Sequence, residues 1–309
     1  MYNLEITICI VSTVRVNVTH LDVETAFLNG DLDETIFMHK PECFQSPDSI
    51  TNKVLKLNKA IYGLKQASRA WNKKVDTCLL SNGYMKSKLE PCMYTKNTND
   101  YKTIVTLYVD DFFIFSNDDT ETRNLKNILA SQLTLKDLGK VKQCLGMNTI
   151  FYKTDGSVSL SQESYIEQLL EKFHMTDCKT VNTPIESKLN VNVNKESMVN
   201  SQMPYQQLIG SLMYLSVLTR PDITFAVSYL SQFDNCHTDE HWANAKRVLK
   251  YLKKTKTFGI KYYKHGNSEI KGFVDSDWGN DSLDRKSYTG FCFLLSDSVI
   301  AWQCKCRKQ

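Results

Sequence analysis

The stretch Thr103-Ile-Val-Thr-Leu-Tyr-Val-Asp-Asp-Phe-Phe-Ile-Phe115 is the clearest indication of fold in this sequence. β-Branched and aromatic residues on both sides of Asp110-Asp111 are typical of two strands, so we predict a hairpin with carboxylates at its tip. Buried strands around an unpaired acid pair are costly unless cations offset the repulsion. The alternative is an ordinary polar β-turn, and the residues alone leave both interpretations open.

Alternation and helical periodicity predict the elements around this hairpin. Asp22 lies near the end of a predicted strand over 16–23, which a loop at Asn29-Gly30-Asp31 follows. Further strands are predicted over 35–38, 272–275, 290–295 and 299–302, and helices over 67–80, 120–132, 164–173, 205–218 and 240–254. A polar connection is predicted over 182–203. This mixture of elements indicates the α+β class.

The composition is that of a globular protein and not of a disordered one. The chain has 309 residues, 42% hydrophobic and 23% charged, which suffices for two domains. A net charge of +4 permits nucleic-acid binding without demanding it. The apolar segment Ile6–Val11 is too short to span a membrane and lacks the features of a secretory signal. We therefore expect no membrane association and an intracellular, non-secreted protein in the cytoplasm, a virus-like particle or the nucleus.

Ten cysteines are scattered along the chain, with no C-x-x-C pair. Cys236, His237 and His241 form the one Cys/His cluster, and it lacks the second close pair that structural zinc sites use. The cysteines therefore indicate a reducing compartment and no zinc site.

Two sets of charged residues could carry chemistry. Asp22, Asp110 and Asp111 come from separate segments, as two-ion phosphoryl chemistry requires, and Mg²⁺ favours a few carboxylates completed by phosphates and water. Mn²⁺ is a possible substitute. Basic residues on the predicted helix over 240–254 suit phosphate contacts, although a solvated helix face explains them equally well. They are Lys246, Arg247, Lys250 and Lys253, followed by Lys254 and Lys256.

Several motifs resemble those of one polymerase family. Tyr108-Val-Asp-Asp111 resembles the hallmark hairpin of reverse transcriptases. The segments 21–32 (LDVETAFLNGDL) and 61–71 (IYGLKQASRAW) resemble the first two motifs of the copia-type retrotransposon polymerases. Later segments match in the same order, namely 135–139, 144–147, 209–215, 219–222 and 241–252. Nearly the whole chain therefore resembles the reverse transcriptase region of copia-type LTR retrotransposon Pol polyproteins.

The resemblance implies a fold and an activity. The fold would be a polymerase palm, an antiparallel sheet backed by helices, over 1–155. A helical thumb or connection over 156–267 and a truncated ribonuclease H-like sheet over 268–309 would follow. The activity would be RNA-directed DNA synthesis by two-metal nucleotidyl transfer. Its partners would be an RNA or DNA template with a primer, and deoxynucleoside triphosphates. The sequence predicts no oligomeric state.

The resemblance also implies roles for single residues. Asp22, Asp110 and Asp111 would hold two Mg²⁺ ions, and Phe27 would lie beneath the incoming sugar and select deoxynucleotides. Other roles would fall to Tyr62, Gly63 and Lys65 on the nucleotide and template side, to Leu145 and Gly146 at the primer terminus, and to Asp275 as the first ribonuclease H acid.

Departures from the family pattern limit the expected activity. Little of the basic fingers segment precedes Asp22, and the remaining ribonuclease H acids would lie beyond residue 309. Cys43 and Ser68 replace a glycine and a proline that are usual in the family. We therefore expect a partial copy with weak or no polymerase activity and no RNA cleavage. The alternatives are a non-catalytic nucleic-acid-binding relic and an unrelated metal-dependent phosphotransferase.

Overall fold

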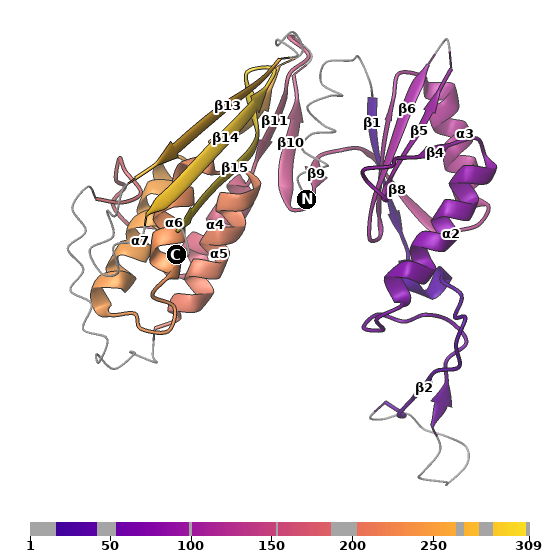
Figure 1. Cartoon of the computed structure of the whole chain (residues 1–309), viewed down its shortest axis with the longest axis horizontal. Coiled ribbons are helices and arrows are strands. Elements are labelled where there is room, and N and C mark those ends of the chain that lie inside the picture. Colours follow the sequence, from indigo (N-terminus) through magenta and orange to yellow (C-terminus); the bar gives the residue numbers. More distant parts are fainter. Residues whose placement is uncertain are drawn as a thin grey trace. The chain divides into compact units, whose positions relative to one another are not determined.

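The computed structural model describes residues 17–41, 54–98, 101–152, 154–186, 203–263, 269–277 and 287–306 (Figure 1). The chain forms two compact units. Among the described residues, one unit lies before residue 142 and the other begins at Lys142. Both units combine antiparallel sheets with α-helices, as the predicted α+β class requires.

A six-stranded antiparallel sheet forms the first unit, in the order β4-β5-β6-β7-β1-β8. The strands are β1 (Asn17–Val23), β4 (Met85–Lys86), β5 (Met93–Asn97), β6 (Lys102–Tyr108), β7 (Asp111–Ser116) and β8 (Leu135–Lys140). Strand β7 is central and apolar on both faces, because Phe112 to Phe115 are all buried. The predicted hairpin therefore lies in the middle of the sheet and not at its edge.

Helices α2 (Ala67–Ser81) and α3 (Asp119–Ala130) pack on one face of this sheet. Helix α2 buries the predicted stripe, including Trp71 and Val75, against Phe112 and Leu21. Burial of each such side chain contributes about 1.5–3 kcal/mol. The hydrophobic core thus lies between the helices and the sheet and leaves the ends of β1 and β7 available for polar groups.

A short 3-10 helix, η1 (Ala26–Asn29), follows β1 and lies against α2. The approach is close because Gly30 has no side chain. A Cβ there would be 3.0 Å from the Cβ of Ala70 and 3.0 Å from the backbone nitrogen of Trp71. The small strands β2 (Phe37–Met38) and β3 (Leu55–Lys56) pair with each other beyond this point.

The second unit contains two sheets and a cluster of helices. One sheet has the order β12-β11-β10-β9, and the other has the order β13-β14-β15. Their strands are β9 (Gln143–Cys144), β10 (Met147–Phe151), β11 (Val158–Ser161), β12 (Gly259–Tyr262), β13 (Ile270–Ser276), β14 (Tyr288–Leu295) and β15 (Ser298–Cys306). The helices are α4 (Glu163–Lys172), α5 (Tyr205–Leu218), η2 (Pro221–Ile223), α6 (Thr224–Ser231) and α7 (Asp239–Lys254).

A buried arginine ties this helical cluster together. Arg220 donates to both carboxylate oxygens of Asp222, at 2.9 and 2.7 Å, and to the carbonyl oxygen of Thr255 at 3.0 Å. Its guanidinium also lies over the rings of Tyr251 and Phe258. The contacts join the start of η2 to the end of α7.

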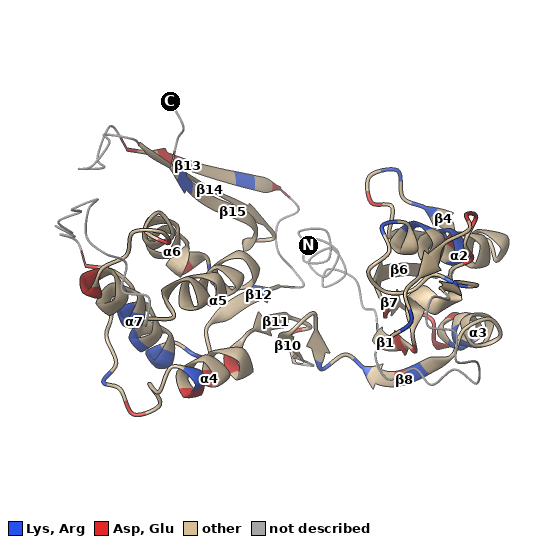
Figure 2. Ribbon diagram, turned by 90° about the horizontal axis from the view of Figure 1, so that it is seen from below, with Lys and Arg blue, Asp and Glu red and all other residues tan. Residues whose placement is uncertain are grey.

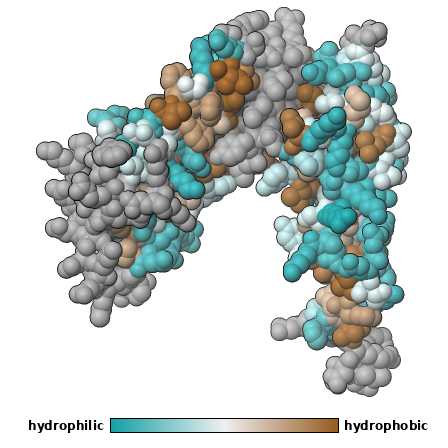
Figure 3. All heavy atoms as spheres, viewed as in Figure 1, coloured by the Kyte–Doolittle hydropathy of each residue, from teal (hydrophilic) through white to brown (hydrophobic). Residues whose placement is uncertain are grey.

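The three-stranded sheet contacts the helices through β15, and β13 is exposed along its whole length. Trp302 of β15 is buried and donates its indole N–H to the carbonyl oxygen of Ser216 on α5, at 2.7 Å. On the other face Ile270, Val274 and Phe293 are exposed, and apolar atoms are visible over β13 and β14 in Figure 3.

The predicted long elements match the structure to within about two residues at most ends, whereas several short ones were not predicted. The helices predicted over 67–80 and 205–218 are α2 and α5. Strands β3 to β5 and β8 to β12, and helix α6, were missed. The compact units divide after Val141, where β10 and β11 pair within the second unit. The predicted division into palm, thumb or connection and ribonuclease H-like part stays a prediction. Of the predicted connection over 182–203, residues 187–202 lie outside the described residues.

No helix in the described ranges is long and apolar enough to cross a membrane.

Candidate active site

The predicted acids lie at a tight hairpin turn. Strand β6 ends at Tyr108 and β7 begins at Asp111, which leaves Val109 and Asp110 as the two turn residues. Val109 has φ 55°, a left-handed conformation that β-branched residues rarely adopt. Such strain persists only where surrounding structure holds it, and it is frequent at functional sites.

Helix α2 holds this turn in place. The indole N–H of Trp71 donates to the carbonyl oxygen of Val109 at 2.7 Å, and its ring meets Phe112 edge-on at 6.5 Å. The segment 61–71 therefore contributes a support for the acid-bearing turn. We call β6, β7 and their turn the acid hairpin.

Asp22 completes the site from the neighbouring strand. Asp22 of β1 is directly opposite Asp111 of β7, and the backbone N–H of Val23 donates to the carbonyl oxygen of Asp110 at 2.9 Å. All three predicted acids are thus gathered at one end of the β1–β7 pair. Burial raises the pKa of Asp110, and the negative charges of Asp111 and Asp22 raise it further.

The three acids suit an open cation site better than a closed one. Within the described ranges, no three His, Cys, Asp or Glu side chains converge closely enough to hold an ion by themselves. Mg²⁺ commonly binds through one or two carboxylates, with water and substrate phosphates completing its shell. Burial, and then the charges of Asp111 and Asp22, raise the pKa of Asp110, and a bound cation would favour its ionised form. The residues therefore fit divalent cations bound together with a phosphate-bearing substrate.

His20 is a member of this site that the sequence interpretation did not include. Its Nε2 lies 2.6 Å from Oδ1 of Asp111, and its ring stacks on Phe113 with centroids 4.6 Å apart. The sequence could have suggested it, because residues two apart on a strand lie on the same face and His20 is two residues before Asp22.

Phe27 and Tyr62, predicted on the nucleotide side, lie next to each other. Their ring centroids are 5.0 Å apart and tilted by 47°. Phe27 is partly buried on η1, whereas Tyr62 is 81% exposed. Gly63 has φ 96° with open space at its Cβ position, and Lys65 is exposed. The structure brings the two rings together, and the nucleotide-binding roles of these residues stay predictions.

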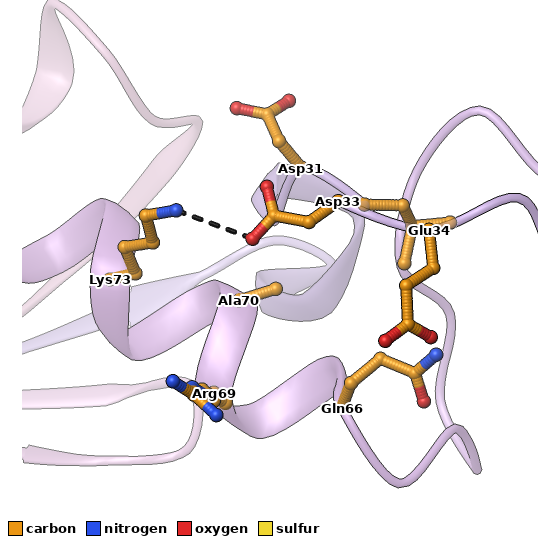
Figure 4. Close-up of a pocket in the computed structure, with 8 residues that line it drawn as sticks. Asp31, Asp33, Glu34, Gln66, Arg69, Ala70 and Lys73 are labelled. Carbon is orange, nitrogen blue, oxygen red and sulfur yellow. Dashed lines mark hydrogen bonds and ion pairs between the residues drawn. The ribbon is translucent and has the colours of Figure 1, made fainter.

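A pocket of about 290 Å³ lies between the 31–34 loop and the first turns of α2 (Figure 4). Glu34 and Gln66 point toward each other across it, and Lys73 pairs with Asp33 at 3.3 Å. Asp31 pairs with Lys59. None of the predicted site residues lines this pocket, so it is a separate feature of mixed charge.

The predicted primer-grip residues form a turn in the second unit. Leu145 and Gly146 join β9 to β10, with φ angles of 50° and 78°. The hydroxyl of Tyr214 on α5 donates to the carbonyl oxygen of Leu145 at 3.1 Å. A Cβ on Gly146 would lie only 2.6 Å from that hydroxyl oxygen, so the tyrosine and the glycine are matched.

Most predicted phosphate-binding residues of α7 already have internal partners. Figure 2 shows Lys and Arg positions along this helix. Arg247 pairs with Glu186 at 2.7 Å, and Lys253 donates to the carbonyl oxygen of Cys178 at 2.8 Å. Lys254 binds the side chain of Asn182, and Lys246 lies over the ring of Trp242. The remaining members are Lys250, for which no partner is found among the described residues, and Lys256, which pairs with Glu163 and Glu167. The phosphate-binding role stays a prediction.

Asp275 and the Cys/His cluster at His241 belong to the second unit, whereas the acid hairpin belongs to the first. Asp275 is exposed on β13, opposite Gly290. His241 has a helix-capping role, because its Nδ1 accepts from the backbone N–H of Thr238 at 3.0 Å. Burial, aided by His237, lowers the pKa of His241 to about 4.

Comparisons with known proteins point in one direction. Residues 3–187 match the family described as reverse transcriptase (RNA-dependent DNA polymerase). The chain is 38% identical over 315 residues to the retrovirus-related Pol polyprotein from transposon TNT 1-94 of Nicotiana tabacum, which covers 100% of this chain and 24% of that protein.

Two further relatives differ in length. The Pol polyprotein from transposon RE1 of Arabidopsis thaliana is 35% identical over 292 residues, covering 94% of this chain and 20% of that protein. A Saccharomyces cerevisiae protein assigned to transposon Ty5-1 is 30% identical over 288 residues, covering 92% of each. The chain thus spans about a quarter or less of the two plant polyproteins.

Proposed function

The chain belongs to the reverse transcriptase (RNA-dependent DNA polymerase) family, in its copia-like retrotransposon branch, and on this premise we propose that its first unit is the catalytic palm of an RNA-directed DNA polymerase. The observation that supports this most directly is the pairing of Asp22 with Asp111 across β1 and β7, beside Asp110 in the turn. Carboxylates from two strands at one end of a sheet are the arrangement that nucleotidyl transfer needs.

The three aspartates would hold two Mg²⁺ ions, for which Mn²⁺ could substitute. When bound, these ions supply Lewis-acid polarisation of the phosphate and activation of the primer 3′-oxygen. Asp22 on β1, and Asp110 and Asp111 on the acid hairpin, would direct their carboxylates at that position from neighbouring strands of one sheet. The polymerase would act on deoxynucleoside triphosphates along a primed RNA or DNA template.

Neighbouring residues would orient the substrates. Phe27 and Tyr62 would together give the incoming nucleotide an aromatic surface, and selection against a 2′-hydroxyl would fall to Phe27. Gly63 leaves room for close approach of a substrate to the backbone, and Lys65 adds a positive charge. In the second unit Leu145 and Gly146 would contact the primer terminus.

A palm, a thumb or connection and a ribonuclease H-like part remain the proposed division of the chain, at 1–155, 156–267 and 268–309. A role in nucleic-acid binding alone has less support. The basic helix α7, on which that role would rest, uses Arg247, Lys253 and Lys254 in internal contacts.

Primer extension on an RNA template tests the proposal. Purified parent protein would be compared with Asp110→Asn and Asp22→Asn, each with Mg²⁺ and with Mn²⁺. Asp119→Asn is the matched control, because Asp119 is an exposed acid of the same unit on the first turn of α3. We expect extension by the parent and by the control, and at least a 100-fold loss in the two site variants. Equal extension by Asp110→Asn would contradict the proposal.

A further inference from the structure

We infer that His20 is a positioning residue that holds Asp111 in the orientation in which it binds a divalent cation. This inference rests on the proposed function. Among the described residues, the His20 side chain is the one that makes a hydrogen bond to a carboxylate of the three acids Asp22, Asp110 and Asp111.

The sheet register places the imidazole for this contact. His20 of β1 is directly opposite Phe113 of β7, and Asp111 is the diagonal neighbour two residues away on the same face. Directly opposed side chains touch, and diagonal ones are within reach of a ring. The observed stack on Phe113, at 4.6 Å and 21°, and the 2.6 Å contact from Nε2 to Asp111 follow from this register.

An irregularity on the other side of β1 favours the same arrangement. The pairing of β1 with β8 shifts register between His20 and Leu21, and Gly139 is the residue opposite His20. Gly139 has φ 73°, a left-handed conformation at the point where the register shifts. Bulges of this kind often occur beside active sites, where they redirect a side chain.

The hydrogen bond fixes one carboxylate oxygen and leaves the other available. The His20 side chain is 14% exposed and that of Asp111 is 31% exposed, so the contact is partly shielded from water. With Nε2–H as the donor, Oδ1 of Asp111 accepts, and Oδ2 keeps all its lone pairs for a cation. Carboxylate ligands held by such hydrogen bonds bind metals more tightly, and loss of the supporting group typically lowers affinity by about 10–100-fold.

Two substitutions separate this role from simple packing. His20→Phe keeps an aromatic ring against Phe113 and removes the N–H donor. His20→Gln loses the ring, and its amide nitrogen can occupy nearly the position of the imidazole Nε2. A packing role predicts that the phenylalanine variant behaves like the parent, whereas a positioning role predicts that the glutamine variant does.

Mn²⁺ binding, followed by the loss of the electron paramagnetic resonance signal of free Mn²⁺, measures the effect without any turnover. The full chain, His20→Phe, His20→Gln and Asp111→Asn would be titrated at one pH and one ionic strength. We expect His20→Phe to bind about 10-fold more weakly than the parent, or worse, and His20→Gln to stay within about threefold of it. Circular dichroism checks the fold of each variant, and His20→Leu replaces His20→Phe if the latter does not fold.

The possible results distinguish the inference from the function on which it rests. If Asp111→Asn weakens binding and His20→Phe does not, the inference is wrong and the proposed cation site stands. A glutamine variant as weak as the phenylalanine variant would also overturn it, because the donor would then not matter. If Asp111→Asn binds like the parent, or the parent leaves all Mn²⁺ free, the proposed site and the role of His20 both fail.

Discussion

Replacement of Trp71 by phenylalanine would remove the hydrogen bond that holds the turn of the acid hairpin. The indole N–H reaches the carbonyl oxygen of Val109 at 2.7 Å, and Trp71 is almost fully buried. Loss of the bond costs about 1 kcal/mol, and the cavity left by the smaller ring costs about 1 kcal/mol more. Because Val109 is held in a left-handed conformation that its branched side chain disfavours, local opening of the turn should become easier.

A total of about 2 kcal/mol corresponds to roughly a 30-fold rise in the opening equilibrium. Hydrogen exchange followed by mass spectrometry would report this rise for peptides that cover 104–116. The matched control is Trp302→Phe, because Trp302 is also buried and donates to a backbone carbonyl oxygen at 2.7 Å, but in the other unit. It should speed exchange in α5 and β15 and leave 104–116 unchanged. Exchange over 104–116 within threefold of the parent in Trp71→Phe would refute the reasoning.

Three further predictions concern the second unit. Arg220→Lys cannot make the bidentate contact with Asp222, so the free energy of unfolding by urea should fall by about 2–3 kcal/mol. An unchanged value would show that the bidentate contact does not stabilise this unit. Burial holds the pKa of His241 at about 4, below the ordinary value of about 6.5, so its contribution to stability is complete above pH 6.5 and is lost as the pH falls toward 4. The urea midpoint should follow this decline, by about 3 kcal/mol in total, and His241→Gln should flatten it; a parallel decline in the variant would disprove the assignment. Tyr214→Phe removes the hydrogen bond to Leu145, worth about 1 kcal/mol, so exchange over 143–148 should rise roughly fivefold; unchanged exchange there would show that other contacts hold the turn.

Elements with a strong period were predictable and those without one were not. Helix α2 was predicted because Trp71, Val75 and Leu79 fall on one stripe, and the structure buries that stripe. Helix α6 was missed because its sequence TFAVSYLS is apolar or small all round and shows no helical period. Strands β9 and β4 have two residues each, too few for alternation to be visible.

The site divides in a similar way. The residue types and the family resemblance indicated Asp22, Asp110 and Asp111. In the structure, the register of β1 with β7 brings Asp22 opposite Asp111. The contact of His20 was not predictable, because a diagonal partner depends on the strand register and on the bulge between His20 and Leu21. Local sequence determines which face a side chain occupies, whereas its partner comes from a segment about ninety residues away.

The partners of the basic residues on α7 were likewise not predictable from local sequence. The clustered lysines and the arginine of α7 left two interpretations open, a surface for phosphates and a solvated helix face. The partners Glu186 and Cys178 lie more than sixty residues earlier in the chain, and no local pattern indicates their approach.

The internal contacts of α7 separate two effects of a positive charge that usually act together. Arg247 meets a carboxylate, so its field is largely cancelled within a Debye length of about 8 Å. Lys253 and Lys254 meet neutral oxygens, so they keep their charge at long range while their N–H groups are engaged. Such lysines can speed the approach of a polyanion, and each must release an internal oxygen before it neutralises a phosphate and frees a counterion. If nucleic acid binds this helix as predicted, its association should slow as salt is added, while the affinity should change less with salt than the number of cations on α7 would imply.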